Sequence, residues 1–125
     1  MSALVQRFEP VLRLRPCRGF WQRLVGLLGR SSIDADEALW IDPCRAIHTF
    51  GMRFAIDVVF LDRRGVVLRV VPALLSWRLA ACSRASSVIE MSAGTAERIG
   101  LEAGDRIEMI AERDGQALRV FQRRS

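Results

Sequence analysis

The pattern of apolar and polar positions predicts a chain built mainly of β-strands. Two nearly continuous apolar runs, Ile56 to Leu61 and Val66 to Val71, flank the turn Asp62-Arg63-Arg64-Gly65. A glycine at the end of such a turn supplies the left-handed backbone conformation that a β-hairpin connection needs. Because neither run alternates with polar residues, we expect both strands at the centre of a sheet, covered on both faces.

Further strands are predicted on either side of this hairpin. Asp114-Gly115 is a strong hairpin signal between two alternating segments. Pro10 cannot donate to a strand ladder, which favours an edge position for the first strand, and Pro16 is expected to end it. The remaining predicted strands cover residues 8–15, 38–42, 86–91, 106–112 and 117–121.

Two short helices complete the prediction. Residues 18–29 place apolar side chains at helical spacing and end at Gly29, which is a favourable helix stop. Thr95 can cap a second helix that Gly100 ends. With 125 residues, we expect a single domain over residues 1–125, mainly β (α+β), forming a β-sandwich or partly open barrel with two short peripheral helices.

The charge balance makes the chain basic but indicates no specific binding partner. The formal net charge is +5, from 19 basic and 14 acidic residues, and every basic residue is an arginine. The arginines are spread along the chain, and the densest clusters are only Arg63-Arg64 and Arg123-Arg124. Without a recognition motif or a tyrosine for base stacking, the sequence argues against nucleic-acid binding. A non-specific anion or nucleic-acid binder stays as one alternative.

Targeting signals and membrane spans are not expected. The first 14 residues lack a long apolar core, so they do not resemble a signal peptide. The apolar stretch from Val66 to Cys82 is interrupted by Arg69, Pro72 and Arg78, which is too polar for a membrane span. We expect a cytoplasmic protein with reduced thiols.

Candidate chemistry concentrates between Cys44 and Asp62. This stretch holds the single histidine of the chain and sets polar groups directly against an apolar strand. We expect a binding or accessory module with a shallow polar cleft around the His48–Asp57 segment, open to a small molecule or a partner protein. The candidate ligand-binding residues are Cys44, His48, Thr49, Arg53 and Asp57.

A catalytic site and a metal site remain alternative interpretations of this stretch. In an extended strand Cys44 and His48 would lie about 13 Å apart, too far for a nucleophile and base. Cys17 and Cys82 could join them in a Cys3His zinc set, but no pair has the C-x2-C spacing of a zinc finger. We therefore predict no catalytic residue, no metal and no cofactor, with a metal-binding or Cys/His-dependent enzyme as the alternative.

Asp57 also has a structural interpretation. A carboxylate in an otherwise apolar strand must be paired or hydrogen-bonded. Arg53, or a backbone N–H of the turn at Gly51, is the expected partner, and the pairing would fix the entry into the central strand.

Three sequence patches resemble the family called domain of unknown function 192. Residues 23–30 are similar to its Arg-x-x-Gly-Leu-Met-x-Arg, residues 56–62 to its Leu-Asp-x-x-Phe-x-Asp strand, and residues 88–105 to its Leu-Glu and Gly-Asp elements. The resemblance runs from about Arg18 to Ile110. It implies a compact, mainly β fold with peripheral helices, and it implies little about activity.

The chain departs from the family pattern near the histidine. Many members read Met-Lys-Asn-Thr where this chain has Thr49-Phe50-Gly51-Met52, and proline where it has Ala55. The chain resembles instead a branch with Ile-His-Thr-x-Gly-Met. A role for the Lys-Asn pair therefore cannot be transferred to it.

Overall fold

The computed structural model describes residues 3–6, 12–18, 30–113 and 115–124. Within these ranges it contains ten strands and one short helix, α2 (Thr95–Arg98). The strands are β1 (Ala3–Gln6), β2 (Leu12–Cys17), β3 (Glu37–Ile41), β4 (Ala46–His48), β5 (Ile56–Leu61), β6 (Val67–Leu74), β7 (Leu79–Ala81), β8 (Ser87–Ser92), β9 (Arg106–Glu112) and β10 (Gly115–Arg124).

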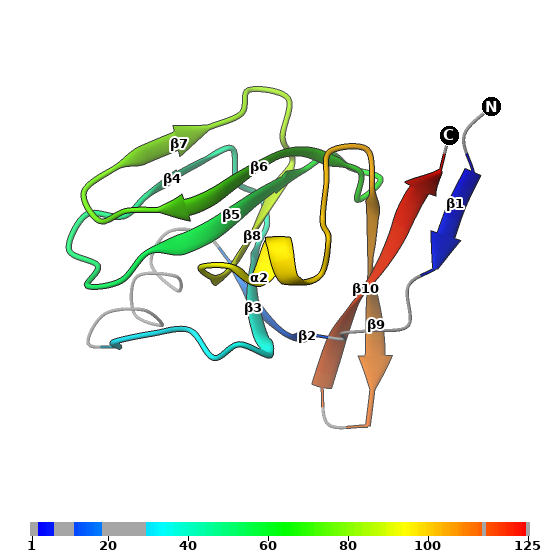
Figure 1. Cartoon of the computed structure of the whole chain (residues 1–125), viewed down its shortest axis with the longest axis horizontal. Coiled ribbons are helices and arrows are strands. Elements are labelled where there is room, and N and C mark those ends of the chain that lie inside the picture. The colour runs from blue at the N-terminus through cyan, green and yellow to red at the C-terminus, as the bar shows by residue number, and fades with distance from the viewer. Residues whose placement is uncertain (1–2, 7–11, 19–29, 114, 125) are drawn as a thin grey trace.

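Eight of the described strands form one mixed sheet, in the order β1-β10-β2-β3-β8-β5-β6, with β9 paired to β10 (Figure 1). Only β2 and β3 run parallel; the other described pairs are antiparallel. A second sheet, β4 with β7, lies at the end of the molecule away from the β9–β10 hairpin. The sheet is not a closed barrel, because no strand ladder joins β6 to β9 in the described residues; next to these strands lie the isolated bridge Val66–Arg106 and a few backbone hydrogen bonds. The prediction of a mainly β fold is confirmed.

The centre of the sheet is occupied by β5. All six of its residues are buried, between β6 on one side and β8 on the other. Val59 and Leu61 pack into one apolar cluster, whereas Val58 and Phe60 pack into a second cluster. Adjacent residues of a strand point to opposite faces, so both faces of the sheet are covered, as the apolar run predicted.

The expectation that the second hairpin strand is equally covered is wrong. β6 alternates between buried, half-buried and exposed residues. It lies last in the strand order, with β5 as its full-length neighbour. An apolar run therefore identified the strand but not its position, because apolar side chains can also remain on a surface.

The first predicted strand continues past its expected end, and its edge position is wrong, while residues 8–11 of the prediction lie outside the described residues. β2 lies between β10 and β3, and it continues through Pro16, which is in register with Trp40. β10 pairs only with Leu12 to Leu14. The edge of β2 that faces away from β3 is therefore unpaired at Pro16, where a missing N–H costs no ladder hydrogen bond.

The predicted cap of the second helix is wrong, although the helix forms. The cap residue is Gly94, with a φ of 91°, and it makes no side-chain cap hydrogen bond. The hydroxyl of Thr95 instead bonds that of Ser92 at 2.5 Å. The predicted helix at 18–29 lies, from residue 19 onward, outside the described residues.

A bidentate ion pair joins β2 to the loop before β3. The guanidinium of Arg13 donates to both carboxylate oxygens of Asp36, each at 3.1 Å. These hydrogen bonds hold the pKa of the Asp36 carboxyl below its ordinary value. The contact lies away from the Cys44–Asp62 stretch.

None of the helices in the described residues is long and apolar enough to cross a membrane.

Candidate functional site

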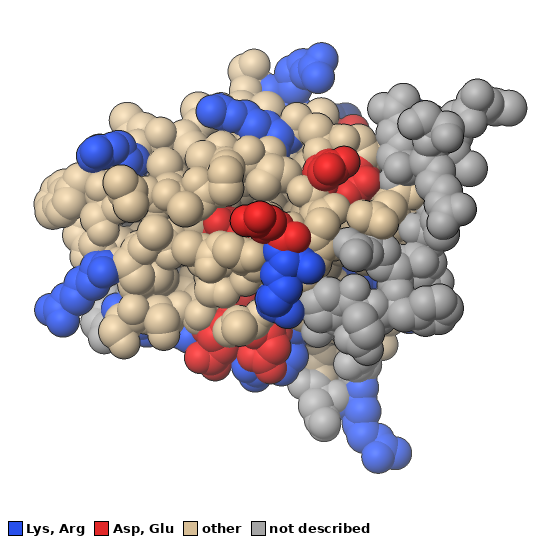
Figure 2. Space-filling model, viewed as in Figure 1, with Lys and Arg blue, Asp and Glu red and all other residues tan. Residues whose placement is uncertain are grey.

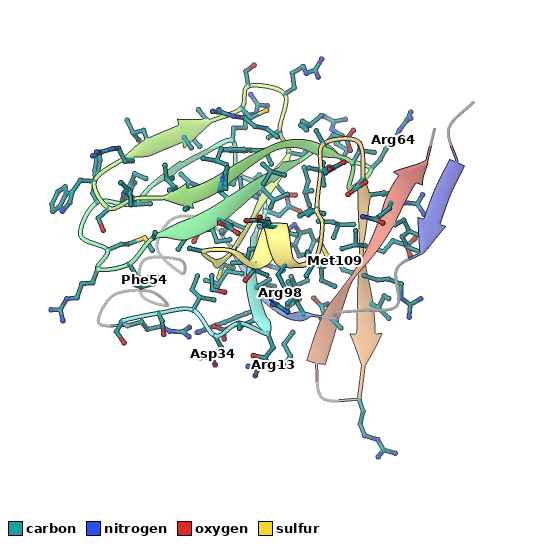
Figure 3. All side chains as sticks on the ribbon, in the orientation of Figure 1. Arg13, Asp34, Phe54, Arg64, Arg98 and Met109 are labelled. Atoms are coloured by element: carbon teal, nitrogen blue, oxygen red, sulfur yellow. The ribbon has the colours of Figure 1, made fainter. Side chains whose placement is uncertain are left out.

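An open cleft of about 630 Å³ lies where the β5–β6 hairpin meets β9 and the loop before β8. The Cys44–Asp62 stretch contributes both of its ends to this cleft, and Arg64 and Met109 come from two of its walls (Figure 3). It is lined by Trp40, residues 42–45, residues 61–65, residues 85–87 and residues 107–109. We refer to it as the cleft.

The hairpin wall of the cleft is held rigidly. Asp62 Oδ1 accepts hydrogen bonds from the N–H groups of Arg64 at 2.8 Å and Val66 at 3.0 Å. Gly65 has a φ of 80°, and its carbonyl accepts a hydrogen bond from the Ile107 N–H at 2.8 Å. A Cβ at Gly65 would lie 2.4 Å from the Ile107 carbonyl oxygen. The turn thus requires glycine both for its left-handed conformation and for its contact with β9.

The opposite wall is fixed by backbone hydrogen bonds. The N–H of Cys44 donates to the Ser86 carbonyl at 3.0 Å, and the N–H of Ser86 donates to the Leu61 carbonyl at 2.8 Å. The Cys44 thiol donates to the Ala46 carbonyl at 3.2 Å. Three segments that are distant in sequence are therefore joined around the cleft by direct contacts.

Charge is distributed unevenly over the cleft. Arg45, Arg63 and Arg64 are exposed, and none lies within ion-pairing distance of a carboxylate among the described residues. The carboxylate of Asp62 is already engaged by the turn, and Glu108 accepts a hydrogen bond from Arg106 at 3.4 Å. The guanidiniums therefore remain available to a ligand, whereas two of the carboxylates are occupied.

The base of the cleft is apolar. Leu61 and Ile107 line it and are almost completely buried. Trp40 is half-buried, and its Nε1 is buried without a hydrogen-bond partner among the described residues. The cleft therefore combines an apolar base with a rim that carries three arginines and three carboxylates, those of Asp42, Asp62 and Glu108, of which Asp42 is exposed.

Of the five candidate residues predicted from the sequence, Cys44 is the one that lines the cleft. His48 lies at the other end of β4, where its Nδ1 accepts the Phe50 N–H at 3.3 Å and its ring packs against Phe50. Cys44 precedes β4, whereas His48 is its last residue. The two side chains are thus not brought together.

The other three candidate residues are placed apart. Thr49 is completely buried and bonds backbone atoms of Leu75 and Arg78. Arg53 is exposed. Asp57 is completely buried, and its Oδ1 and Oδ2 accept the N–H groups of Ala73 and Ala96, each at 2.8 Å.

The expected pairing of Asp57 is therefore wrong, because its partners belong to β6 and α2 rather than to Arg53 or the Gly51 turn. The cleft is not lined by His48, Thr49, Arg53 or Asp57. Cys17, Cys44 and Cys82 are free thiols. Within the described ranges, no three His, Cys, Asp or Glu side chains gather in a way that could hold a metal ion.

Sequence reasoning missed the main cleft residues. The sequence marks Arg63 and Arg64 as part of a turn and as a dense arginine cluster, but not as a binding site, and it marks Trp40 only as part of a strand. The adjacent arginines of a hairpin turn were a visible signal. Their approach to residues 85–87 and 107–109 depends on strand pairing across the sheet, which no local pattern encodes.

Comparison with known proteins gives a family and a fold. The model of the DUF192 family, described as "Uncharacterized ACR", matches residues 5–109. No curated protein matches the chain. A protein of unknown function from Novosphingobium aromaticivorans DSM 12444 is similar in structure, with a TM-score of 0.69 and 18% identity over 78% of this chain and 74% of that chain.

A second similar structure comes from Sinorhizobium meliloti 1021 and is described as a "putative transcription regulator". It has a TM-score of 0.71 and 20% identity, over 86% of this chain and 90% of that chain. At such low identity, the similarity to both structures establishes the shared fold alone.

Proposed function

The chain belongs to the DUF192 family, whose description assigns no activity, and on this premise we propose that it is a small binding module whose cleft takes an anionic small molecule. The proposal keeps the binding role expected from the sequence. It moves the binding site to the two ends of the Cys44–Asp62 stretch, where the cleft lies.

The observation that carries the proposal is the set of three guanidiniums around an apolar base, those of Arg45, Arg63 and Arg64, which form no ion pair within the part of the chain that the structure describes. Guanidiniums bind carboxylates and phosphates through paired hydrogen bonds. An apolar base favours a ligand that carries a flat or aliphatic body beside its anionic group. The rigid turn supports this role, because a preformed site loses little entropy when it binds.

Phenyl phosphate and inorganic phosphate are suitable probes. We expect phenyl phosphate to shift backbone amide resonances of residues 61–65, 85–87 and 107–109 in an NMR titration. Inorganic phosphate should bind more weakly, because it cannot cover the apolar base. The variant R63A/R64A should weaken phenyl phosphate binding by about tenfold or more, since each charged hydrogen bond contributes about 1.5–3 kcal/mol.

The matched control is R15A/R113A, which removes the same charge from two exposed residues outside the cleft. It should leave the affinity within a factor of about two if long-range charge is screened. Equal weakening in both variants, or resonance shifts that spread evenly over the surface, would show that phosphate binds through net charge rather than in the cleft.

A further inference from the structure

Four large apolar side chains stand exposed at the end of the molecule formed by β4, β7 and their connections. Phe50 is 42% exposed, Leu75 58%, Trp77 65% and Leu79 69%. We call these four residues the aromatic tip. Neither the cleft nor the smaller pocket near Arg13 is lined by any of them.

Ring contacts and strand register connect three of the four residues of the aromatic tip, Phe50, Trp77 and Leu79. The rings of Phe50 and Trp77 stack with their centroids 5.7 Å apart and their planes at 22°. The ring of His48 also packs against Phe50, with the centroids 5.0 Å apart. Leu79 is in register with His48 across the β4–β7 pair. Residues of two distant segments are thus brought together at the tip.

The backbone beneath the tip is largely satisfied by one buried residue. The Thr49 hydroxyl donates to the Leu75 carbonyl at 2.6 Å and accepts the Arg78 N–H at 2.9 Å. The Thr49 carbonyl accepts the N–H of Trp77 at 3.1 Å, and the Thr49 N–H donates to the Arg78 carbonyl at 3.0 Å. Such a loop can enter a poorly hydrated environment, because these backbone groups need no water.

The two stretches of sequence that carry the tip hold basic residues and no acidic ones. Residues 43–56 and 63–89 contain seven of the 19 arginines and none of the 14 acidic residues. The rest of the chain therefore carries 12 basic and 14 acidic residues. Arginine and uncharged residues cover the left end of the molecule in Figure 2, whereas the acidic side chains visible there lie away from that end. Of the seven arginines in these two stretches, Arg53 and Arg78 lie close in sequence to the tip residues, Arg45, Arg63 and Arg64 line the cleft, and Arg69 and Arg84 are the other two.

We propose that the aromatic tip docks on the surface of a lipid bilayer that contains anionic lipid. Tryptophan and phenylalanine favour the interface between lipid headgroups and acyl chains. Arginines near an anionic leaflet add attraction that salt weakens. The tip combines both signals, which is what stable but reversible attachment to a membrane surface requires.

A bilayer fits this surface better than a folded partner. The tip consists of exposed side chains and does not line a groove. The charged residues in its two stretches of sequence are all arginines, with no acidic residues among them. A patterned interface would pair individual charges with those of one partner. The membrane proposal is independent of the cleft and of its ligand.

Vesicle co-sedimentation tests the proposal with the full chain. Vesicles of phosphatidylcholine containing phosphatidylglycerol should retain the protein at low salt, and vesicles of phosphatidylcholine alone should retain much less. W77N/L79T should reduce binding by about tenfold or more, since it removes two of the four exposed apolar side chains. Asparagine tolerates the left-handed conformation of Trp77, whose φ is 63°, and threonine suits the exposed strand position of Leu79.

The charge contribution is tested by R53A/R78A against the control R15A/R113A. The first variant should weaken binding by about tenfold, and the second should have a much smaller effect, because its residues lie outside the basic segments. The Trp77 fluorescence of the bound wild type should shift to the blue, and W77F should lose this change. Thermal melting would establish that each variant is folded.

Two results would overturn the proposal, and a third would support it. Equal binding to neutral and anionic vesicles by wild type and W77N/L79T would exclude docking through the tip. A wild-type dimer that W77N/L79T converts to a monomer, without vesicle binding, would assign the tip to a second copy of the chain. Retention of phenyl phosphate binding together with loss of vesicle binding in W77N/L79T would support the membrane proposal and separate it from the cleft.

Discussion

Asp57 connects three elements through a single buried carboxylate. It belongs to β5, and it accepts one N–H from Ala73 in β6 and one from Ala96 in α2. Helix α2 begins without a side-chain cap of its own, so the carboxylate of Asp57 serves its first turn from a distant strand. Both partners come later in the chain than Asp57. The sequence therefore indicated that this carboxylate had to be paired, but not with which groups.

We expect Asp57→Ala to reduce the free energy of unfolding by about 3 kcal/mol, because two buried N–H groups lose a charged acceptor. Asp57→Asn keeps one carbonyl oxygen and should lose about half as much. Urea denaturation monitored by circular dichroism measures both. Glu102→Ala, at an exposed carboxylate, is the control and should change stability by less than about 0.5 kcal/mol. Equal losses at Asp57 and Glu102 would contradict the assigned role.

At the scale of elements, the segment 75–78 is held to the end of β4 by Thr49. The hydroxyl and both backbone polar groups of Thr49 bond this segment, and the side chain is completely buried. Trp77 adopts a left-handed conformation, with a φ of 63°. A non-glycine residue in this conformation persists only where its surroundings hold it. The conformation of the aromatic tip therefore depends on Thr49.

Thr49→Val keeps the shape of the side chain and removes its hydroxyl. We expect a loss of about 2 kcal/mol, since the Arg78 N–H and the Leu75 carbonyl lose their buried partner. Hydrogen exchange should locate the effect, with the Arg78 amide exchanging at least about tenfold faster than in the wild type. Thr49→Ser retains the hydroxyl and should keep most of the protection. Unchanged exchange at Arg78 in Thr49→Val would show that the bond contributes little.

Local patterns identified several strands closely, but they shortened the two longest, β6 and β10, and missed the shortest. The runs that became β5, β8 and β9 were found within a residue or two of their bounds, because burial and turn residues mark them in the sequence. β4 and β7 were missed, since each has three residues and little apolar contrast. The candidate residues in 48–57 were chosen for their chemistry alone. Pairing with residues 73–78 and 96 decided that Thr49 and Asp57 became internal supports.

At the scale of the whole molecule, the junction between the β5–β6 hairpin and β9 brings the two ends of the large sheet together. The N–H of Val67 donates to the Asp105 carbonyl at 2.7 Å, and the N–H of Gly104 donates to the Val67 carbonyl at 2.8 Å. Val66 and Arg106 form the single bridge between them. The cleft lies at this junction, which explains why it escaped prediction: its walls become neighbours only after the sheet has curled.

Gly65 is the position where this junction can be tested. Gly65→Ala would place a Cβ 2.4 Å from the Ile107 carbonyl oxygen, at a φ of 80°. Gly51 has the same φ, but nothing lies within 4 Å of a Cβ there. The left-handed conformation costs alanine about 1 kcal/mol. We therefore expect a loss of about 1 kcal/mol for Gly51→Ala and about 3 kcal/mol for Gly65→Ala, where the hairpin must also move away from β9.

Because the difference between these two variants isolates the contact with Ile107, urea denaturation of both measures how much the junction stabilises the sheet. Only Gly65→Ala should also weaken phenyl phosphate binding, since the displaced turn carries Arg63 and Arg64 away from the apolar base of the cleft. Equal losses of stability would mean that the hairpin moves freely against β9. In that case the cleft would owe its shape to the hairpin alone, and the sheet would not need the bridge to hold its two ends together.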